Sequence, residues 1–134
     1  MHPAFSVIFF TVTSGAGYGL IALLCLFNFL YFGMLFDKTN FLIFSGVSVA
    51  LFTMGLISST FHLANPKNAW RAFMRFRTSW LAREGLLAIL FYPTLFLYLI
   101  LIYFDFYKEY FLIMQLYSIY IFFFAIVIIY CTGM

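Results

Sequence analysis

The sequence carries little charge for its length. Charged residues make up 8% of its 134 residues, whereas hydrophobic residues make up 66%. Soluble domains usually contain roughly 25% charged residues. So few charges cannot cover the surface of a water-soluble domain, and a chain of this length has room for one domain only. The composition therefore excludes an ordinary soluble domain and predicts a protein whose outer solvent is lipid.

Metal-ligand motifs are lacking as well. Cys25 and Cys131 lie in apolar runs, and the sequence contains neither a Cys-x-x-Cys motif nor a Cys/His cluster with metal-ligand spacing. The only histidines that could serve as axial ligands of a haem are His2 and His62, and His2 lies at the start of the chain. We therefore expect no metal and no haem in this chain.

Positive charge is confined to one short segment. Five of the seven Lys and Arg residues fall within 17 positions: Lys67, Arg71, Arg75, Arg77 and Arg83. A surface that binds nucleic acid needs many solvated Lys and Arg residues over a whole face. This distribution excludes a nucleic-acid-binding protein and indicates a single basic patch.

Four apolar stretches dominate the rest of the sequence, and a transmembrane helix needs about 20 apolar residues. The expected transmembrane helices cover about 8–31, 41–63, 79–104 and 110–133. The predicted fold is an all-α membrane protein, a polytopic bundle of about four transmembrane helices forming one membrane domain over 1–134. The last stretch reaches Met134 without a charged tail, so we expect the N-terminal half of a larger protein.

The polar connection between the second and third stretches predicts a short amphipathic helix. Asn65-Pro66 is a strong helix start, with Asn as the N-cap and Pro at the first helical position. Basic residues then recur every four positions on one face: Lys67, Arg71 and Arg75. We expect an interfacial helix over about 66–76. With Arg77, its basic face either docks a soluble partner or contacts lipid headgroups and sets topology.

Two ionisable residues flank this connection. His62 lies near the end of the second span and Glu84 near the start of the third, so antiparallel helices bring both to one membrane face. Ionisable groups at membrane depth are costly and usually mark a functional path. One interpretation is a structural pair. The other is a pair of proton acceptors at a quinol site, with Trp70 and Trp80 as flat walls.

Small residues at helical spacing predict close helix packing, since helices in lipid approach through small side chains. They are Gly15 and Gly19 on the first helix, and Gly55 and Ser59 on the second.

Several segments together resemble a known family. They are His2-Pro-Ala-Phe-Ser-Val-Ile, Thr13-Ser-Gly-Ala-Gly-Tyr-Gly19, Phe61-His-Leu, Ala69-Trp-Arg-Ala72 and Thr78-Ser-Trp-Leu-Ala-Arg-Glu84. The sequence resembles the membrane anchor subunit of the dimethyl sulfoxide reductase family of complex iron–sulfur molybdoenzymes. The resemblance covers the N-terminal half of such an anchor.

The resemblance implies an electron-transfer subunit without metal of its own. Such an anchor oxidises menaquinol as its bound substrate in anaerobic respiration. It passes the electrons to an iron–sulfur subunit and, through that subunit, to a molybdopterin catalytic subunit. We expect a multi-pass protein of the bacterial cytoplasmic membrane. Two alternatives stay open, a small transporter or channel and a structural anchor without a quinol site. The orientation of the 64–84 connection also stays open.

Overall fold

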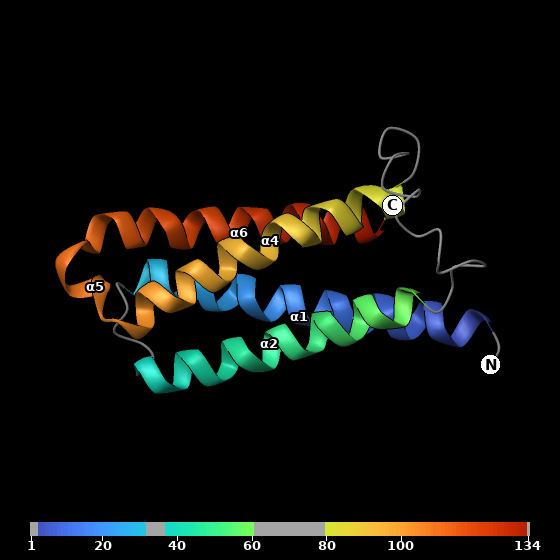
Figure 1. Cartoon of the computed structure of the whole chain (residues 1–134), viewed down its shortest axis with the longest axis horizontal. Helices are drawn as coiled ribbons and strands as arrows, with labels where there is room; N and C mark the ends of the chain where they lie inside the picture. Colours follow the sequence, from blue (N-terminus) through green and yellow to red (C-terminus); the bar gives the residue numbers. More distant parts are fainter. Residues whose placement is uncertain (1–2, 32–36, 61–79, 134) are drawn as a thin grey trace.

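The computed structural model describes residues 3–31, 37–60 and 80–133, and within them it contains helices and no strand. Four long helices carry the fold: α1 (Pro3–Leu30), α2 (Lys38–Thr60), α4 (Trp80–Tyr103) and α6 (Phe111–Gly133). A short helix, α5 (Phe106–Glu109), lies between α4 and α6 (Figure 1). The predicted all-α class is confirmed. The expected interfacial helix over 66–76 lies outside the described residues.

Each long helix is long and apolar enough to cross a membrane. The candidate spans are Ile8–Leu30, Lys38–Ser58, Arg83–Tyr103 and Phe111–Thr132. At 1.5 Å per residue, the 28 residues of α1 extend over about 42 Å, which is longer than a hydrocarbon core of about 30 Å. The excess lies before Ile8, where α1 begins at Pro3, a residue well suited to the first helical turn.

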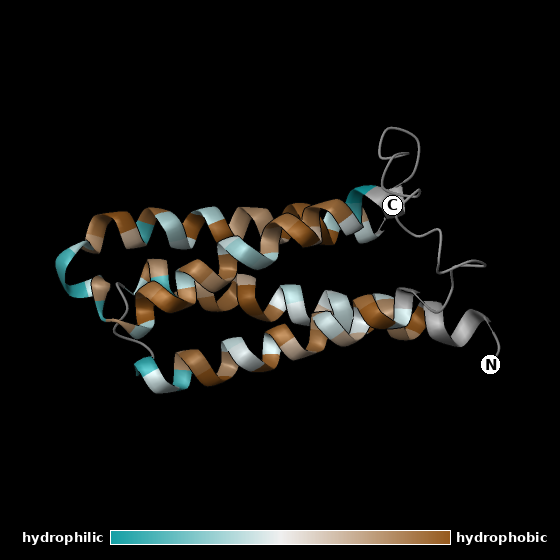
Figure 2. Ribbon diagram, in the orientation of Figure 1, coloured by the Kyte–Doolittle hydropathy of each residue, from teal (hydrophilic) through white to brown (hydrophobic). Residues whose placement is uncertain are grey.

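The helices form an antiparallel bundle with a defined order of neighbours. α1 packs against α2 and α6, and α4 packs against α6 and, less extensively, α2. One end of the bundle holds the starts of α1 and α4 and the ends of α2 and α6 (Figure 1). We call it the Glu84 end. The opposite end holds α5 and the start of α2, and we call it the α5 end. Figure 2 shows hydrophilic colour concentrated at these ends, at the starts of α2 and α4 and around α5.

The reversal from α4 to α6 depends on Asp105. This residue has a left-handed backbone conformation, with φ of 59° and ψ of 24°, which Asp tolerates better than most side chains. Its amide donates to the carbonyl of Ile102 and its carbonyl accepts from the amide of Lys108, both at 3.1 Å. The backbone therefore stays hydrogen-bonded through the turn, and α6 returns beside α4.

An aromatic cluster fills the middle of the bundle. Tyr18 stacks on Phe52, with ring centroids 4.7 Å apart and planes 7° apart. Phe91 meets the edge of Tyr18 at 5.6 Å, and all three side chains are fully buried. Offset stacking and edge contacts are the favoured arrangements of aromatic rings. One residue from each of α1, α2 and α4 thus ties three helices together.

Close approach of α1 to α2 depends on two glycines. A Cβ at Gly17 would lie 2.6 Å from the backbone nitrogen of Phe52, and a Cβ at Gly55 would lie 2.8 Å from Ser14. Backbone atoms cannot move aside as a flexible side chain can, so both positions need glycine. The Ser48 hydroxyl also donates to the Gly17 carbonyl at 2.7 Å. The predicted packing residue Gly55 therefore lies in this contact.

Gly15 and Gly19 lie outside the contact between α1 and α2. Beyond the neighbouring backbone of α1, a Cβ at either position would meet no atom of the described residues within 4 Å. Gly15 and Gly19, four residues apart, lie on one face of α1. The face that packs against α2 instead contains Gly17, which is two residues from each of them and therefore lies on roughly the opposite side of the helix. Contact of Gly15 and Gly19 with a further helix stays a prediction, and the side chain of Ser59 lies outside the description.

Candidate functional site

The Glu84 end of the bundle buries a carboxylate. Glu84 lies in the second turn of α4, and only 3% of its surface is exposed. It shares the inner face of α4 with Ala88 and Phe91, both of which are buried. The hydroxyl of Thr132, near the end of α6, lies 3.0 Å from its Oε1 atom. A buried carboxylate at membrane depth is costly, so Glu84 is the candidate functional residue at this end of the bundle.

The Thr132 hydroxyl connects two acceptors but has one proton. Its Oγ1 lies 3.0 Å from Glu84 and 2.9 Å from the carbonyl of Ile128. When Glu84 is ionised, Thr132 donates to the carboxylate. When Glu84 is protonated, the carboxyl group donates to Thr132, which then donates to Ile128. The carboxyl group therefore keeps a hydrogen-bond partner in either protonation state, as a group that exchanges protons requires.

The other residues predicted at this end lie mostly outside the described part of the chain. His62 and Trp70 are among them, as are the four basic residues Lys67, Arg71, Arg75 and Arg77. Trp80 begins α4, but its side chain is not described. The quinol-site prediction thus rests on Glu84 alone among its side chains, and the proximity of Glu84 to His62 stays a prediction.

A buried polar network that the sequence reasoning missed lies toward the α5 end. The Asn28 side-chain amide donates to the Tyr98 hydroxyl at 2.8 Å and to the Ser118 hydroxyl at 3.1 Å. Tyr98 and Ser118 are also hydrogen-bonded to each other. All three residues are buried, and they come from α1, α4 and α6. The network therefore joins three helices at one place.

Gln115 extends this network to the surface. Its Nε2 donates to the backbone carbonyl of Asn28 at 3.4 Å and to the hydroxyl of Tyr107. Its buried Oε1 has no hydrogen-bond partner among the described residues. A useful signal in the sequence was available, because Asn28 and Gln115 are carboxamides inside otherwise apolar stretches. Such side chains in membrane helices commonly hydrogen-bond across helices.

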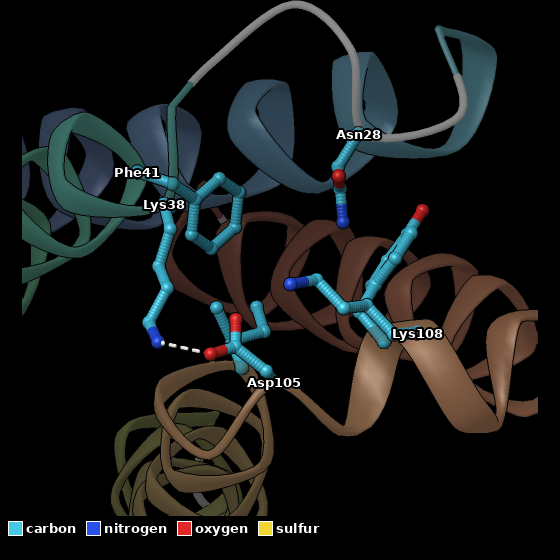
Figure 3. Close-up of a pocket in the computed structure, with 7 residues that line it drawn as sticks. Asn28, Lys38, Phe41, Asp105 and Lys108 are labelled. Carbon is cyan, nitrogen blue, oxygen red and sulfur yellow. Dashed lines mark hydrogen bonds and ion pairs between the residues drawn. The ribbon is translucent and has the colours of Figure 1, made fainter.

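A recess of about 180 Å³ opens beside this network. Residues of α1, α2, α4, α5 and the turn before α5 line it: Asn28, Lys38, Phe41, Ile102, Asp105, Tyr107 and Lys108. Lys38 binds Asp105 across its mouth with 2.9 Å between Nζ and Oδ2, and the Lys108 side chain points into it (Figure 3). The recess lies between the polar ends of the spans, where a membrane protein meets lipid headgroups and water.

Electrostatics around the recess follow from these contacts. The hydrogen bond from Lys38 lowers the pKa of the Asp105 carboxyl group, and the charges of Lys38 and Lys108 lower it further. Partial burial raises the pKa of the Tyr107 hydroxyl, although the hydrogen bond from Gln115 opposes that shift. Asp105 is therefore ionised and Tyr107 protonated at neutral pH.

Residues 3–31, 37–60 and 80–133 contain no group of three or more His, Cys, Asp or Glu side chains that could hold a metal ion. The two cysteines are free thiols, with Cys25 buried in the core.

The sequence profile of the DMSO reductase anchor subunit (DmsC) family matches residues 1–134. The chain belongs to this family. It is similar to a sulfite dehydrogenase subunit of Allochromatium vinosum, with 43% identity over 93 residues, covering 63% of this chain and 27% of that protein. The anchor chain thus aligns with about a quarter of the length of that relative. No solved structure matches the chain.

Membership of the anchor family agrees with the apolar bundle. Between 28% and 44% of each candidate span is buried inside the structure, so most of its surface is left for lipid or further protein. The chain is a multi-pass membrane protein of an anchor family, and both polar regions described here lie at the ends of its spans.

Proposed function

We propose that this chain is the quinol-handling part of a membrane anchor subunit in a molybdoenzyme complex of the bacterial cytoplasmic membrane. It oxidises menaquinol and passes the electrons to an iron–sulfur subunit, which delivers them to a molybdopterin catalytic subunit. The observation that carries this proposal is the buried Glu84, hydrogen-bonded to Thr132 at the end of the bundle where the basic segment enters α4.

Quinol oxidation defines what the site must do. Each quinol gives up two electrons and two protons and leaves as quinone. In the proposed site, Glu84 accepts one proton and His62 the other, and both protons leave to the water at this membrane face. Trp70 and Trp80 provide flat apolar walls for the ring. The electrons continue to the iron–sulfur partner, since the chain itself supplies no metal in this proposal.

The arrangement of Glu84 and Thr132 supports the proton-accepting role. A carboxylate that takes a proton from quinol changes from acceptor to donor, and a buried group without a partner in one of those states would be strongly disfavoured. Thr132 offers a partner in both states because its proton can point to Glu84 or to Ile128.

The basic segment provides the proposed contact with the partner. Lys67, Arg71 and Arg75 recur every four residues in the sequence that follows His62, and in this proposal the docked iron–sulfur protein places its cluster close to the quinol. Changing all three to Gln should release the partner from membranes or invert the anchor, while helix insertion stays normal. Fractionation and accessibility labelling measure both effects. A bound partner and normal orientation in this variant would contradict the docking role.

A second direction of electron flow has one observation in its favour. The relative from Allochromatium vinosum is named a dehydrogenase of sulfite, whereas the family profile is named for a reductase. In an oxidising complex the same site would reduce quinone, taking up two electrons and two protons. Glu84 would then act as proton donor, as microscopic reversibility requires.

The test is carried out on the assembled complex with two assays. Glu84→Gln and His62→Leu should slow quinol oxidation by about 10²- to 10⁴-fold, the contribution typical of a positioned general base. A reduced dye that feeds the partner directly should support normal activity in both variants. Glu109→Gln, at an exposed position in α5, is the matched control and should behave as wild type.

Each alternative predicts a different pattern. A structural pair predicts equal losses in the quinol and dye assays, because the complex would not assemble. An anchor without a quinol site predicts normal quinol oxidation in both variants. The direction of electron flow is tested by two rates: reduction of menaquinone by the reduced partner, and oxidation of menaquinol by the oxidised partner. A higher rate of menaquinone reduction would favour the quinone-reducing direction.

A further inference from the structure

The recess at the α5 end is far from the proposed quinol site and needs its own explanation. It is lined by residues of α1, α2, α4, α5 and the turn before α5, whereas Glu84 and Thr132 lie at the opposite end of the bundle (Figure 1). The proposed quinol site does not include it. The polar wall of the recess continues into the buried network of Asn28 and Gln115. The recess is therefore not formed by exposed side chains alone.

Charge around the recess favours an anion. Lys38 and Lys108 contribute two positive charges and Asp105 one negative charge, which leaves one net positive charge. The Lys38 ammonium group is already bound to Asp105 at 2.9 Å. Lys108 makes no ion pair with another described residue, and its amine points into the recess (Figure 3). Lys108 is therefore the cation left to bind a ligand.

Tyr107 supplies a second donor. The Nε2 of Gln115 must be the donor toward Tyr107 and Asn28, because the Asn28 backbone carbonyl can only accept. The Tyr107 hydroxyl therefore acts as acceptor toward Gln115 and keeps its own proton for another partner. Tyr107 and Lys108 both line the recess, which therefore offers a hydroxyl and an ammonium donor to an oxyanion.

The rest of the lining is apolar and fits a lipid better than a free ion. Phe41 and Ile102 are buried at the base of the recess. Lys38 starts one candidate span and Tyr103 ends another, so the recess lies at the depth of the headgroups. A free phosphate ion would leave the apolar wall unused, whereas a lipid places its glycerol backbone and first methylene groups there.

We propose that this recess binds the phosphodiester group of an anionic phospholipid, with Lys108 and Tyr107 as donors and Phe41 and Ile102 against the glycerol and acyl carbons. The lipid would act as a structural ligand that joins α2 to the turn between α4 and α6. This inference is independent of the quinol chemistry, because none of its residues belongs to the proposed quinol site.

The test measures lipid retention by native mass spectrometry of the full chain in detergent, titrated with phosphatidylglycerol. Lys108→Gln should weaken binding by about tenfold, the value for losing one hydrogen bond to a charged group. Asp105→Asn should strengthen binding, because it raises the net charge of the recess. Glu109→Gln is the matched control: it removes a negative charge in the same helix, but Glu109 does not line the recess.

The outcomes separate the possible ligands. Equal binding of phosphatidylglycerol to Lys108→Gln and wild type overturns the proposal. Weaker binding of phosphatidylglycerol to Asp105→Asn also overturns it, because removing a negative charge from the recess should favour an anionic lipid. Competition by millimolar inorganic phosphate overturns the lipid as the source of the phosphate. Stronger binding to Glu109→Gln, matching that to Asp105→Asn, overturns a built site, because general surface charge then explains retention. Circular dichroism confirms that each variant keeps its helix content.

Discussion

Lys38, the first residue of α2, donates a 2.9 Å hydrogen bond to Asp105, the left-handed residue that turns the chain between α4 and α6. The Lys38 ammonium group also lies 5.4 Å from the centre of the Tyr103 ring. One exposed side chain thus fixes the start of α2 to the end of α4, although 67 positions separate the two bonded residues.

The ion pair predicts how stability depends on pH. The pKa of Asp105 is lowered in the folded protein, chiefly by the hydrogen bond from Lys38. Its stabilising contribution is therefore full above the unfolded pKa of about 3.9 and is lost as the pH falls through the lower folded pKa. The thermal midpoint of the wild type in detergent should fall more steeply below pH 4 than that of Asp105→Asn. Asp37→Asn is the control, and parallel curves for all three proteins would contradict the prediction.

Two glycines on α1 should respond oppositely to the same substitution. Gly17→Ala places a Cβ 2.6 Å from the Phe52 backbone, so we expect a loss of about 1–3 kcal/mol from overpacking. Gly15→Ala meets no atom within 4 Å and should gain up to about 1 kcal/mol of helix propensity. Unfolding in mixed detergent micelles measures both changes. Equal effects would show that α1 does not pack on α2 through Gly17.

The Asn28 network should behave as one unit. Asn28→Leu removes the donors to Tyr98 and Ser118, and interhelical hydrogen bonds in membranes average about 0.6 kcal/mol. We expect a loss of about 1–2 kcal/mol. Tyr98→Phe in the same background should cost less than it does alone, because the two residues share partners. Strict additivity in this double-mutant cycle would argue against a shared network.

Thr132 should affect the rate rather than assembly. Thr132→Val keeps the shape of the side chain but removes the hydroxyl that bonds Glu84. We expect quinol oxidation by the assembled complex to slow by about tenfold, the value of one hydrogen bond to a charged group. Thr132→Ser should restore most of the rate, and the dye-driven assay should stay normal in both. A shift in the pH–rate profile of Thr132→Val distinguishes proton handling from a merely structural effect.

The sequence predicts the spans because one physical quantity, apolar length, determines them. Four uninterrupted stretches of about 20 residues have no other stable place than lipid. It also identifies Glu84 as exceptional, since a lone carboxylate near an apolar span needs a reason. Neither inference requires knowing which residues contact each other in the folded protein.

The sequence does not predict which faces meet. The spacing of four residues predicts packing through Gly15 and Gly19, whereas the position of Phe52 on α2 selects Gly17. Asn28 and Ser118 are 90 positions apart, so nothing local to either indicates the other. In lipid every helix face is apolar, and the hydrophobic period that identifies a buried face in water is largely lost. The recess depends on these pairings and was therefore missed.

The Asn28 network has a consequence for biogenesis. Asn28 is made long before its partners, which follow 70 and 90 positions later. At synthesis rates of about 5–20 residues per second, its amide waits roughly 5 to 20 seconds for Ser118. During that interval the Asn28 amide lacks its two folded-state acceptors and depends on other hydrogen-bond partners. We therefore expect α1 to take up its final place in the bundle only after α6 has brought the Ser118 hydroxyl to it.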